Sequence, residues 1–354
     1  MYRIKRIFES VVVRVLSIVL FVSFLLSGFF CFDFYQRQVN KIKGYYWVYR
    51  GDKAYKKDNL QSAISCYQRG IKLHPKHYRA MFNLANIYVV YEDYYAAIEN
   101  YEKALRVKPD FENARIDYAI ILAQTYQINK AIEQYEKVIE NKPRFIKIPF
   151  LVDNKKSYNH NRGVAYYNMG IAYRAKSLLA GNTKQTSRAY LSKAQKSYEE
   201  AADILKSYNS NYNLALVNQV LRNQYQAGYY YCRAIAISPM EYEAHFNLAV
   251  LLNELKQYQK ASEEFKKAAL LLDSKGDSST IKYIYDMLSE VNQKATIEEE
   301  KSKDDTKKET QQEDIKLQYK NGKVVLLEKS DGEEDFKNSF KTCSASELFM
   351  KEEE

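Results

Sequence analysis

Residues 78–111, YRAMFNLANIYVVYEDYYAAIENYEKALRVKPDF, decide the fold class of this chain. Small residues at three points would let two helices approach closely, and large residues around them would fill the remaining space. The small residues are Ala85, Ala97 and Ala104, and the large ones are Met81, Leu84, Tyr88 and Tyr101. Pro109 follows the second helix and ends it, because proline donates no backbone hydrogen bond to the preceding turn. The stretch predicts a helix–turn–helix unit.

The unit recurs along the chain with a period of 34 residues. That period separates Pro75, Pro109 and Pro143, then Ala63, Ala97 and Ala131, and also Tyr67, Tyr101 and Tyr135. A single helix pair cannot bury its own apolar stripe, so successive pairs must stack on one another. The abundance of tyrosine, with 33 residues, against 11 glycines and 5 prolines also favours helices packed on helices.

The pattern resembles the tetratricopeptide repeat family, with large, small, aromatic and proline residues at the family's positions. The resemblance implies an all-α, right-handed superhelical solenoid of about six helix–turn–helix repeats. Repeats 1–3 take residues 44–145 and repeats 5–6 take residues 208–275. Between them, residues 163–207 form an expanded fourth repeat, whose second helix is displaced by about a dozen residues.

Other segments interrupt or follow the repeats. Residues 146–162 are an insertion, which either covers a groove and contacts a partner or is a linker packed on neighbouring helices. Residues 276–295 predict an amphipathic capping helix with one apolar face. Residues 296–354 form a charged, largely disordered tail, with a small hairpin at 315–328 around the Asn321-Gly322 turn.

The N-terminus predicts a membrane segment. Residues 1–10 are a basic leader, residues 11–32 a transmembrane signal anchor and residues 33–43 a linker. Within the anchor, VLSIVLFVSFLLSGFFCF at 15–32 carries no charge, and about 20 apolar residues cross a bilayer. A cleaved signal and lipidation of Cys31 remain alternatives. We expect a single-pass protein of a bacterial inner membrane, with the repeats on the extracytoplasmic side.

The whole chain has a net charge of +10; the tail from Thr296 has 11 Lys against 17 Asp and Glu, a net of −6, so the part before it carries +16. A basic body can face nucleic acid, anionic lipid or acidic peptides, or it can consist of solvated lysine-rich helix faces. No nucleic-acid-binding motif accompanies the charge, so we expect no nucleic-acid partner.

The residues that carry chemistry are scattered. The four cysteines have no metal-ligand spacing, and the chain has no P-loop, GxGxxG, GxSxG or HExxH motif. His245 occupies position 4 of a repeat, where a large core residue belongs. We therefore expect no enzyme activity, no cofactor or metal, and no small-molecule substrate.

The resemblance implies that partners bind the concave side, which the first helix of each repeat forms. Four first helices carry an aromatic residue at position 5 and asparagine at position 6, and one carries asparagine at position 9. These residues are Phe82, Asn83, Asn86, Tyr167, Asn168, Tyr212, Asn213, Phe246 and Asn247. Their amides either bond to an extended peptide or join neighbouring helices. Asp52, at position 9 of the first repeat, would repel a peptide carboxylate.

The sequence therefore predicts a membrane-anchored scaffold that binds a protein or peptide partner in its groove, in the assembly or maintenance of a cell-envelope complex. The alternatives are a self-associating structural module and a carrier of an extended peptide.

Overall fold

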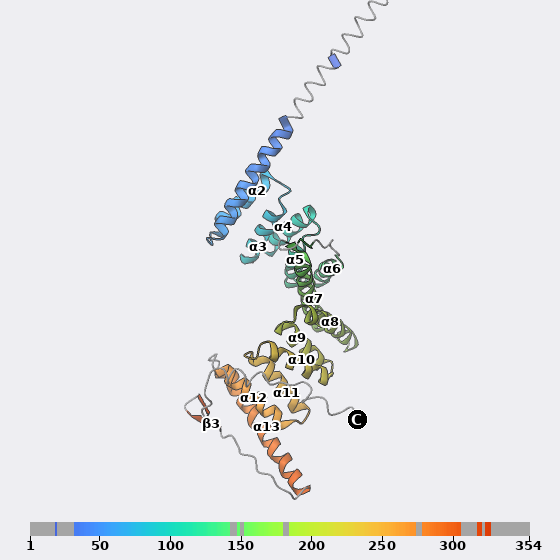
Figure 1. Cartoon of the computed structure of the whole chain (residues 1–354), viewed down its shortest axis with the longest axis vertical. Helices are drawn as coiled ribbons and strands as arrows, with labels where there is room; N and C mark the ends of the chain where they lie inside the picture. Colours follow the sequence, from blue (N-terminus) through green and yellow to red (C-terminus); the bar gives the residue numbers. More distant parts are fainter. Residues whose placement is uncertain are drawn as a thin grey trace, which may run out of the picture. The chain divides into compact units, whose positions relative to one another are not determined.

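The computed structural model describes residues 18–19, 32–141, 147–148, 152–179, 184–273, 278–305, 317–320 and 323–326. Helices make up almost all of this described part (Figure 1). The predicted all-α class is confirmed. The chain divides into two compact units, Met1–Lys130 and Ala131–Glu354.

The described part of the first unit opens with one continuous helix over residues 32–55. It is followed by α2 (Leu60–Leu73), α3 (Tyr78–Val90), α4 (Tyr94–Val107) and α5 (Glu112–Gln124). From α2 onward, each of these helices packs against the next. Residues 33–43, predicted to be a linker, lie within the helix over residues 32–55, which runs into the first repeat. They contain no glycine or proline to end a helix, and Arg37 forms an i,i+4 ion pair with Asp33.

The second unit continues the same order of paired helices. It contains α7 (Asn154–Leu179), α8 (Lys184–Leu205), α9 (Tyr208–Val220), α10 (Gln224–Ile237), α11 (Tyr242–Glu254), α12 (Tyr258–Asp273) and α13 (Ser278–Asp305). Consecutive helices pack together from α7 through α13. The helix α6 (Ile128–Glu140) crosses the division between the units.

The turn between the two helices of a repeat recurs at one position of the 34-residue frame. At that position a non-glycine residue adopts the left-handed backbone, namely Asp58, Glu92, Tyr126, Arg222 and Lys256. The next residue returns its N–H to the first helix, as from Asp93 to the carbonyl of Tyr88 at 2.9 Å. The side chain of Asp93 then caps α4 by accepting from the N–H of Ala96 at 3.0 Å. One short turn thus ends one helix and begins the next.

The core of each repeat rests on one small and one aromatic position of the second helix. The alanines Ala63, Ala97, Ala131, Ala194, Ala227 and Ala261 are fully buried, and so are the rings of Tyr67, Tyr101, Tyr135, Tyr198, Tyr231 and Phe265. The first helix places a small residue against the ring. A Cβ atom on Gly51 would lie 2.7 Å from Cδ1 of Tyr67, and one on Gly170 would lie 2.6 Å from Cε1 of Tyr198. Position 8 must therefore stay small, since larger groups would overlap the ring.

The fourth repeat is enlarged in both of its helices. The helix α7 has 26 residues and α8 has 22, whereas α9 and α10 of the next repeat have 13 and 14. Residues 154–162 of the predicted insertion at 146–162 form the first part of α7. Before α7, β1 (Lys147–Ile148) and β2 (Val152–Asp153) form an antiparallel pair.

The last described helix, α13, packs against α12 of the sixth repeat. Ile281, Ile284, Leu288 and Val291 are buried, as the predicted apolar face of a cap requires. Residues 296–305, at the start of the tail predicted to be largely disordered, continue α13. Glutamate and lysine favour helix, which explains the continuation. Further along, β3 (Leu317–Lys320) and β4 (Lys323–Leu326) pair antiparallel within the predicted hairpin segment.

The predicted basic leader and signal anchor lie almost entirely outside the described residues. Among the residues that the structure does describe, no helix is both long enough and apolar enough to cross a membrane.

Candidate functional site

The nine residues predicted to contact a partner all lie on first helices, namely α3, α7, α9 and α11. Each side chain is half-buried, so part of it reaches the surface. These side chains make different contacts in different repeats. The contacts show which residues join helices and which remain available to bind a partner.

In the second unit, asparagine and tyrosine side chains join neighbouring repeats. Asn213 donates from Nδ2 to the phenol oxygen of Tyr167 at 3.2 Å, and Asn247 donates to that of Tyr212 at 2.8 Å. Each bond connects position 5 of one repeat with position 6 of the next. Both amides also donate to a backbone carbonyl one turn earlier on their own helix. The amide groups therefore bond helix to helix, which is one of the two roles that the sequence left open.

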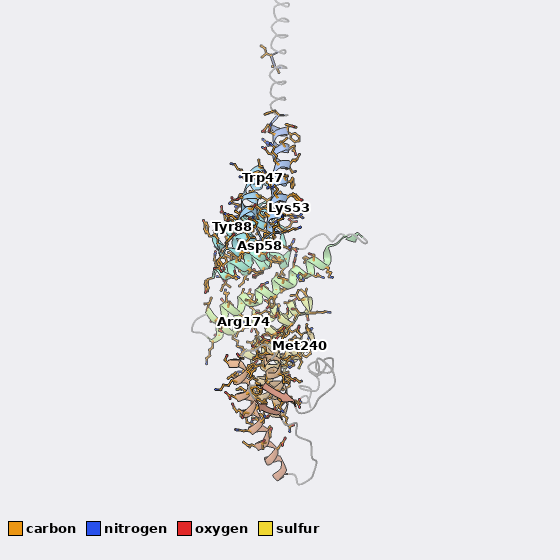
Figure 2. All side chains as sticks on the ribbon, turned by 90° about the vertical axis from the view of Figure 1, so that its left-hand side faces the viewer. Trp47, Lys53, Asp58, Tyr88, Arg174 and Met240 are labelled. Atoms are coloured by element: carbon orange, nitrogen blue, oxygen red, sulfur yellow. The ribbon has the colours of Figure 1, made fainter. Side chains whose placement is uncertain are left out.

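Arg174 on α7, labelled in Figure 2, completes this arrangement. Its Nη1 donates to Oδ1 of Asn213 at 2.9 Å. Asn213 thus bonds to the side chains of both Tyr167 and Arg174, and it links α7 to α9.

In the first unit, the corresponding amides are also engaged. Asn83 donates to Oδ1 of Asp52 at 3.2 Å, and the same carboxylate oxygen accepts from the hydroxyl of Tyr67 at 2.7 Å. Asn86 accepts from the hydroxyl of Tyr101 at 2.6 Å. The carboxylate of Asp52 therefore bridges helices of the first two repeats.

The remaining predicted residues have local roles. Asn168 donates to the carbonyl of Val164 on its own helix at 2.9 Å. The ring of Phe82 packs edge-on against Phe111, with centroids 5.0 Å apart. The ring of Phe246 lies 6.0 Å from that of Tyr283 on α13. Both phenylalanines are therefore parts of aromatic clusters.

A hollow of about 330 Å³ lies between the first helices of the fifth and sixth repeats. It is lined by Tyr208, Asn209, Tyr212, Asn213, Glu241 and Glu243. The rings of Tyr208 and Tyr212 stack almost parallel, with centroids 5.5 Å apart and planes at 10°. The hollow thus has an aromatic wall from α9, amides beside it, and carboxylates at the beginning of α11.

The electrostatics of the hollow are set by burial and by its carboxylates. Burial raises the pKa of the Tyr208 phenol, and the charges of Glu243 and Glu241 raise it further. Burial and Glu243 likewise raise the pKa of Tyr212, whose hydrogen bond from Asn247 acts in the opposite direction. Both phenols therefore stay neutral at physiological pH, beside a region of negative potential.

Two of the predicted residues, Tyr212 and Asn213, lie in this hollow. Sequence reasoning missed the other four, because it selected residues at positions 5, 6 and 9 of the first helix, whereas these four stand at or just before its start. Tyr208 stands at position 1 and Glu241 at position 34 of the repeat, the junction between successive repeats. The aromatic residues at position 1, which are Tyr78, Tyr208 and Tyr242, were the available signal.

Residues 78–111, 50–90 and 242–271 each match the tetratricopeptide repeat family. This chain is a tetratricopeptide repeat protein. No curated protein matches it.

Solved structures show the same type of fold. PilF of Pseudomonas aeruginosa is 13% identical, with a TM-score of 0.50 over 66% of this chain and 93% of that one. PilW, described as a widely conserved type IV pilus biogenesis factor, is 17% identical, with a TM-score of 0.45 over 65% of this chain and 92% of its own. YrrB, described as a TPR protein with an unusual peptide-binding site, is 18% identical, with a TM-score of 0.39 over 55% and 85%. The likeness to PilF shows a shared tetratricopeptide repeat fold.

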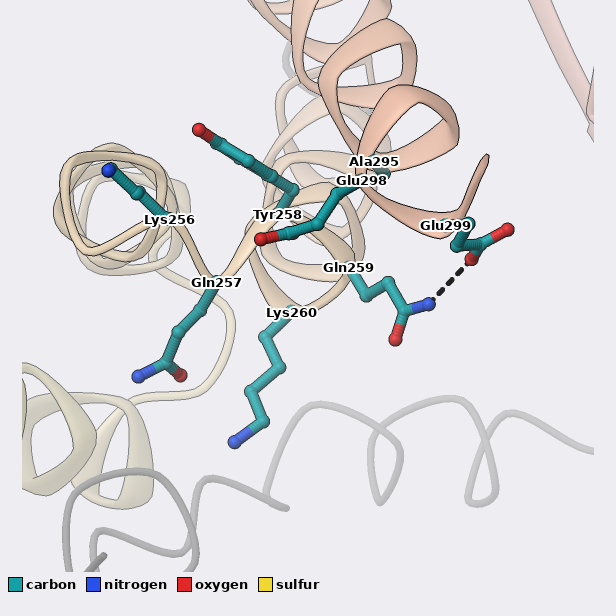
Figure 3. A pocket seen from close by; sticks show the side chains of 8 residues that line it. All are labelled: Lys256, Gln257, Tyr258, Gln259, Lys260, Ala295, Glu298 and Glu299. Atoms are coloured by element: carbon teal, nitrogen blue, oxygen red, sulfur yellow. Dashed lines mark hydrogen bonds between the residues drawn. The ribbon is translucent and has the colours of Figure 1, made fainter. Parts of the chain in front are cut away.

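A second hollow in this tetratricopeptide repeat protein, of about 340 Å³, lies between the start of α12 and the C-terminal part of α13 (Figure 3). Its charged side chains are Lys256, Lys260, Glu298 and Glu299. Gln259 donates to Oε1 of Glu299 at 2.6 Å, as the dashed line in Figure 3 shows. This hollow carries both signs of charge and lies away from the first-helix surface. The hollow on α9 and α11 is therefore the stronger candidate site.

No group of three metal-ligating side chains occurs among the described residues. The candidate site instead combines aromatic, amide and carboxylate groups, which are suited to contact a peptide.

Proposed function

We propose that this chain is a single-pass, membrane-anchored scaffold that holds a protein or peptide partner on the first-helix surface of its second unit. The partner belongs to a cell-envelope complex, and the repeats lie outside the cytoplasm of a bacterial cell. The observation that carries the proposal is the hollow beside Tyr208 and Tyr212, because it opens on the surface that tetratricopeptide repeats use to bind partners.

The proposed anchor is supported by the residues at its edge. The uncharged run at 15–32 follows Arg3, Lys5 and Arg6. At the end of this run and just after it, Phe32, Phe34 and Tyr35 are all more than half exposed. Aromatic side chains concentrate where a membrane-spanning helix meets the lipid headgroups, so this cluster fits the outer end of an anchor.

The continuous helix over residues 32–55 supports a scaffold held close to the membrane. It enters the first repeat without a break, where Val48 packs against Tyr67 in one buried cluster. A helix rises about 1.5 Å per residue and does not collapse as a flexible linker would. The first repeat would therefore stand at a defined distance from the bilayer.

Site-specific photo-crosslinking tests the partner surface. A photoreactive amino acid replaces Asn209, which is exposed and lines the hollow, in the full-length protein within its source cells. We expect a discrete cross-linked adduct at this position. The matched control places the same group at Glu263, which is exposed on α12. Equal adducts at both positions, or none at Asn209, would contradict a partner site in the hollow.

A separate measurement tests the anchor and its orientation. The full-length protein should remain in the membrane pellet after extraction with alkaline carbonate. A periplasmically active reporter fused after Glu354 should be active, and a cytoplasmic reporter should not. The reverse pair of activities would place the repeats in the cytoplasm, and release by carbonate would exclude the anchor.

A further inference from the structure

The surroundings of the tyrosine at position 1 differ between the second and the fifth repeats. In the second repeat, the face of Tyr78 meets two cations of the chain itself. The Nζ of Lys108 lies 5.0 Å from its ring centroid and the Cζ of Arg79 lies 5.9 Å from it. Phe111 packs edge-on against the same ring, with centroids 5.2 Å apart. The second repeat therefore supplies both cations and an aromatic cover for its own tyrosine.

The fifth repeat has lost all three of these groups. The frame places Ser238 where Lys108 stands, Asn209 where Arg79 stands and Glu241 where Phe111 stands. Tyr208 instead stacks on Tyr212, and the hollow of about 330 Å³ lies beside them. Glu241 stands in place of an aromatic ring, which leaves room, and the fifth repeat lacks the two cations that face the corresponding tyrosine of the second repeat.

The carboxylates make the hollow complementary to a cation. Glu241 and Glu243 both line it, and Oε2 of Glu243 is buried without a hydrogen-bond partner. A buried carboxylate oxygen without a partner is unfavourable, so a donor that enters the hollow would satisfy it. The face of a tyrosine ring also attracts ammonium and guanidinium groups.

Among the described residues, Arg174 brings a positive charge to the border of the site. Arg174 donates to Oδ1 of Asn213, which places its guanidinium on the side of the hollow toward α7. It would repel a second cation there, so an incoming basic group should lie near Glu243, on the α11 side. Arg174 would at the same time favour a backbone carbonyl or a carboxylate of a partner next to that basic group.

We propose that this hollow binds the side chain of a single lysine or arginine in an extended partner segment, between the tyrosine rings and the Glu241 and Glu243 carboxylates. The inference rests on the proposed function, because it presumes a peptide on the first-helix surface. The volume is at the lower end of the range of about 300–1,000 Å³ for ligand pockets, which fits one side chain and not a whole peptide.

The test uses the full-length protein in detergent and a library of random twelve-residue peptides displayed on phage. Selection against the wild type should enrich peptides with lysine or arginine at one fixed position. In a fluorescence anisotropy titration, the best such peptide should lose about tenfold in affinity when that residue is replaced by norleucine. The same peptide should lose a similar factor against Glu243→Gln.

The decisive comparison is a double-mutant cycle. If the basic side chain binds at Glu243, the norleucine peptide should bind Glu243→Gln and the wild type equally well. The substitution Ser238→Lys supplies the cation that the second repeat has, and it should weaken the lysine peptide but not the norleucine peptide. Glu263→Gln, which changes an exposed carboxylate on α12, should leave every affinity unchanged.

The outcomes separate this inference from the proposed function. If no peptide family is enriched, the proposed peptide-binding function itself fails. If peptides are enriched without a fixed basic position, or if the effect of norleucine persists in Glu243→Gln, peptide binding stands and the basic-residue site is overturned.

Discussion

The imidazole Nδ1 of His245 lies 2.6 Å from Oε2 of Glu264 in the core of the second unit. The other ring nitrogen, Nε2, lies 3.0 Å from the carbonyl oxygen of Pro239. Lys267 donates to the second carboxylate oxygen of Glu264 at 2.7 Å. His245 is fully buried, as its position in the repeat predicts, and it belongs to a buried charge network.

The substitution Glu264→Gln should destabilise the protein at neutral pH by about 3 kcal/mol, because it removes the buried carboxylate that His245 and Lys267 share. Burial alone raises the pKa of Glu264, but the hydrogen bond and charge of His245, with the charge of Lys267, lower it below its usual value of 4.5. The carboxylate therefore contributes stability that is complete above that value and is lost as pH falls through the folded-state pKa. Denaturant titrations from pH 7 to pH 3 should show the two proteins converging at the acidic end.

Glu263→Gln is the matched control for this prediction, since Glu263 is the exposed neighbour of Glu264 on the same helix. Its stability should follow that of the wild type at every pH. A constant difference between Glu264→Gln and the wild type across the whole range would show that packing, and not charge, accounts for the effect.

Asp117 should destabilise the first unit at neutral pH. It stands at position 6, where four other repeats have asparagine, and burial raises its pKa from 3.8 to about 6. The folded state thus favours the protonated acid, and stability falls as pH rises from about 4 to above 6. Asp117→Asn should raise the free energy of unfolding by about 1–2 kcal/mol at pH 8 and by almost nothing at pH 4.

Asp110→Asn provides the comparison for Asp117, because Asp110 is exposed in the turn before the same helix. Thermal unfolding at both pH values should show little change for this control. A stabilisation of Asp117→Asn that is equally large at pH 4 would refute the electrostatic explanation.

Tyr126→Gly should stabilise the protein by about 0.5–1 kcal/mol. Tyr126 has φ 61° and its side chain is 82% exposed, so it loses few contacts while its Cβ is strained in the left-handed region. Tyr126→Ala removes the same ring and keeps the Cβ, so it should show no such gain. If the glycine and alanine variants have the same melting temperature, backbone strain is not the cause.

Gly170→Ala should destabilise the enlarged fourth repeat by about 1–3 kcal/mol, because its new methyl group would overlap the ring of Tyr198. A second change, Tyr198→Leu, removes that ring and costs stability by itself. In the Tyr198→Leu background, Gly170→Ala should be much less harmful, and urea unfolding of the four proteins measures this coupling. Additive effects would mean that the ring does not limit position 170.

The sequence predicted the repeat frame better than the ends of its elements. The first helices of regular repeats begin 34 residues apart, as α3 at Tyr78 and α5 at Glu112 do. The fixed positions of small and large residues allow the helices to pack in only one way. The ends of the helices were harder to predict. Residues 33–43 and 296–305 carry no apolar period, but they also lack helix breakers, and both continue a neighbouring helix.

The sequence by itself determined the period, the helix pairs, the buried alanine and tyrosine positions and the surface on which a partner site was expected. Only the tertiary structure decided which residues of that surface remain available. Asn83, Asn213 and Asn247 bond to side chains from another repeat, and such bonds depend on how one helix pair rotates against the next. The same rotation brings Glu241 and Glu243 beside Tyr208 and Tyr212. A hollow is the space that several side chains leave unfilled, so the pattern of a single helix does not reveal it.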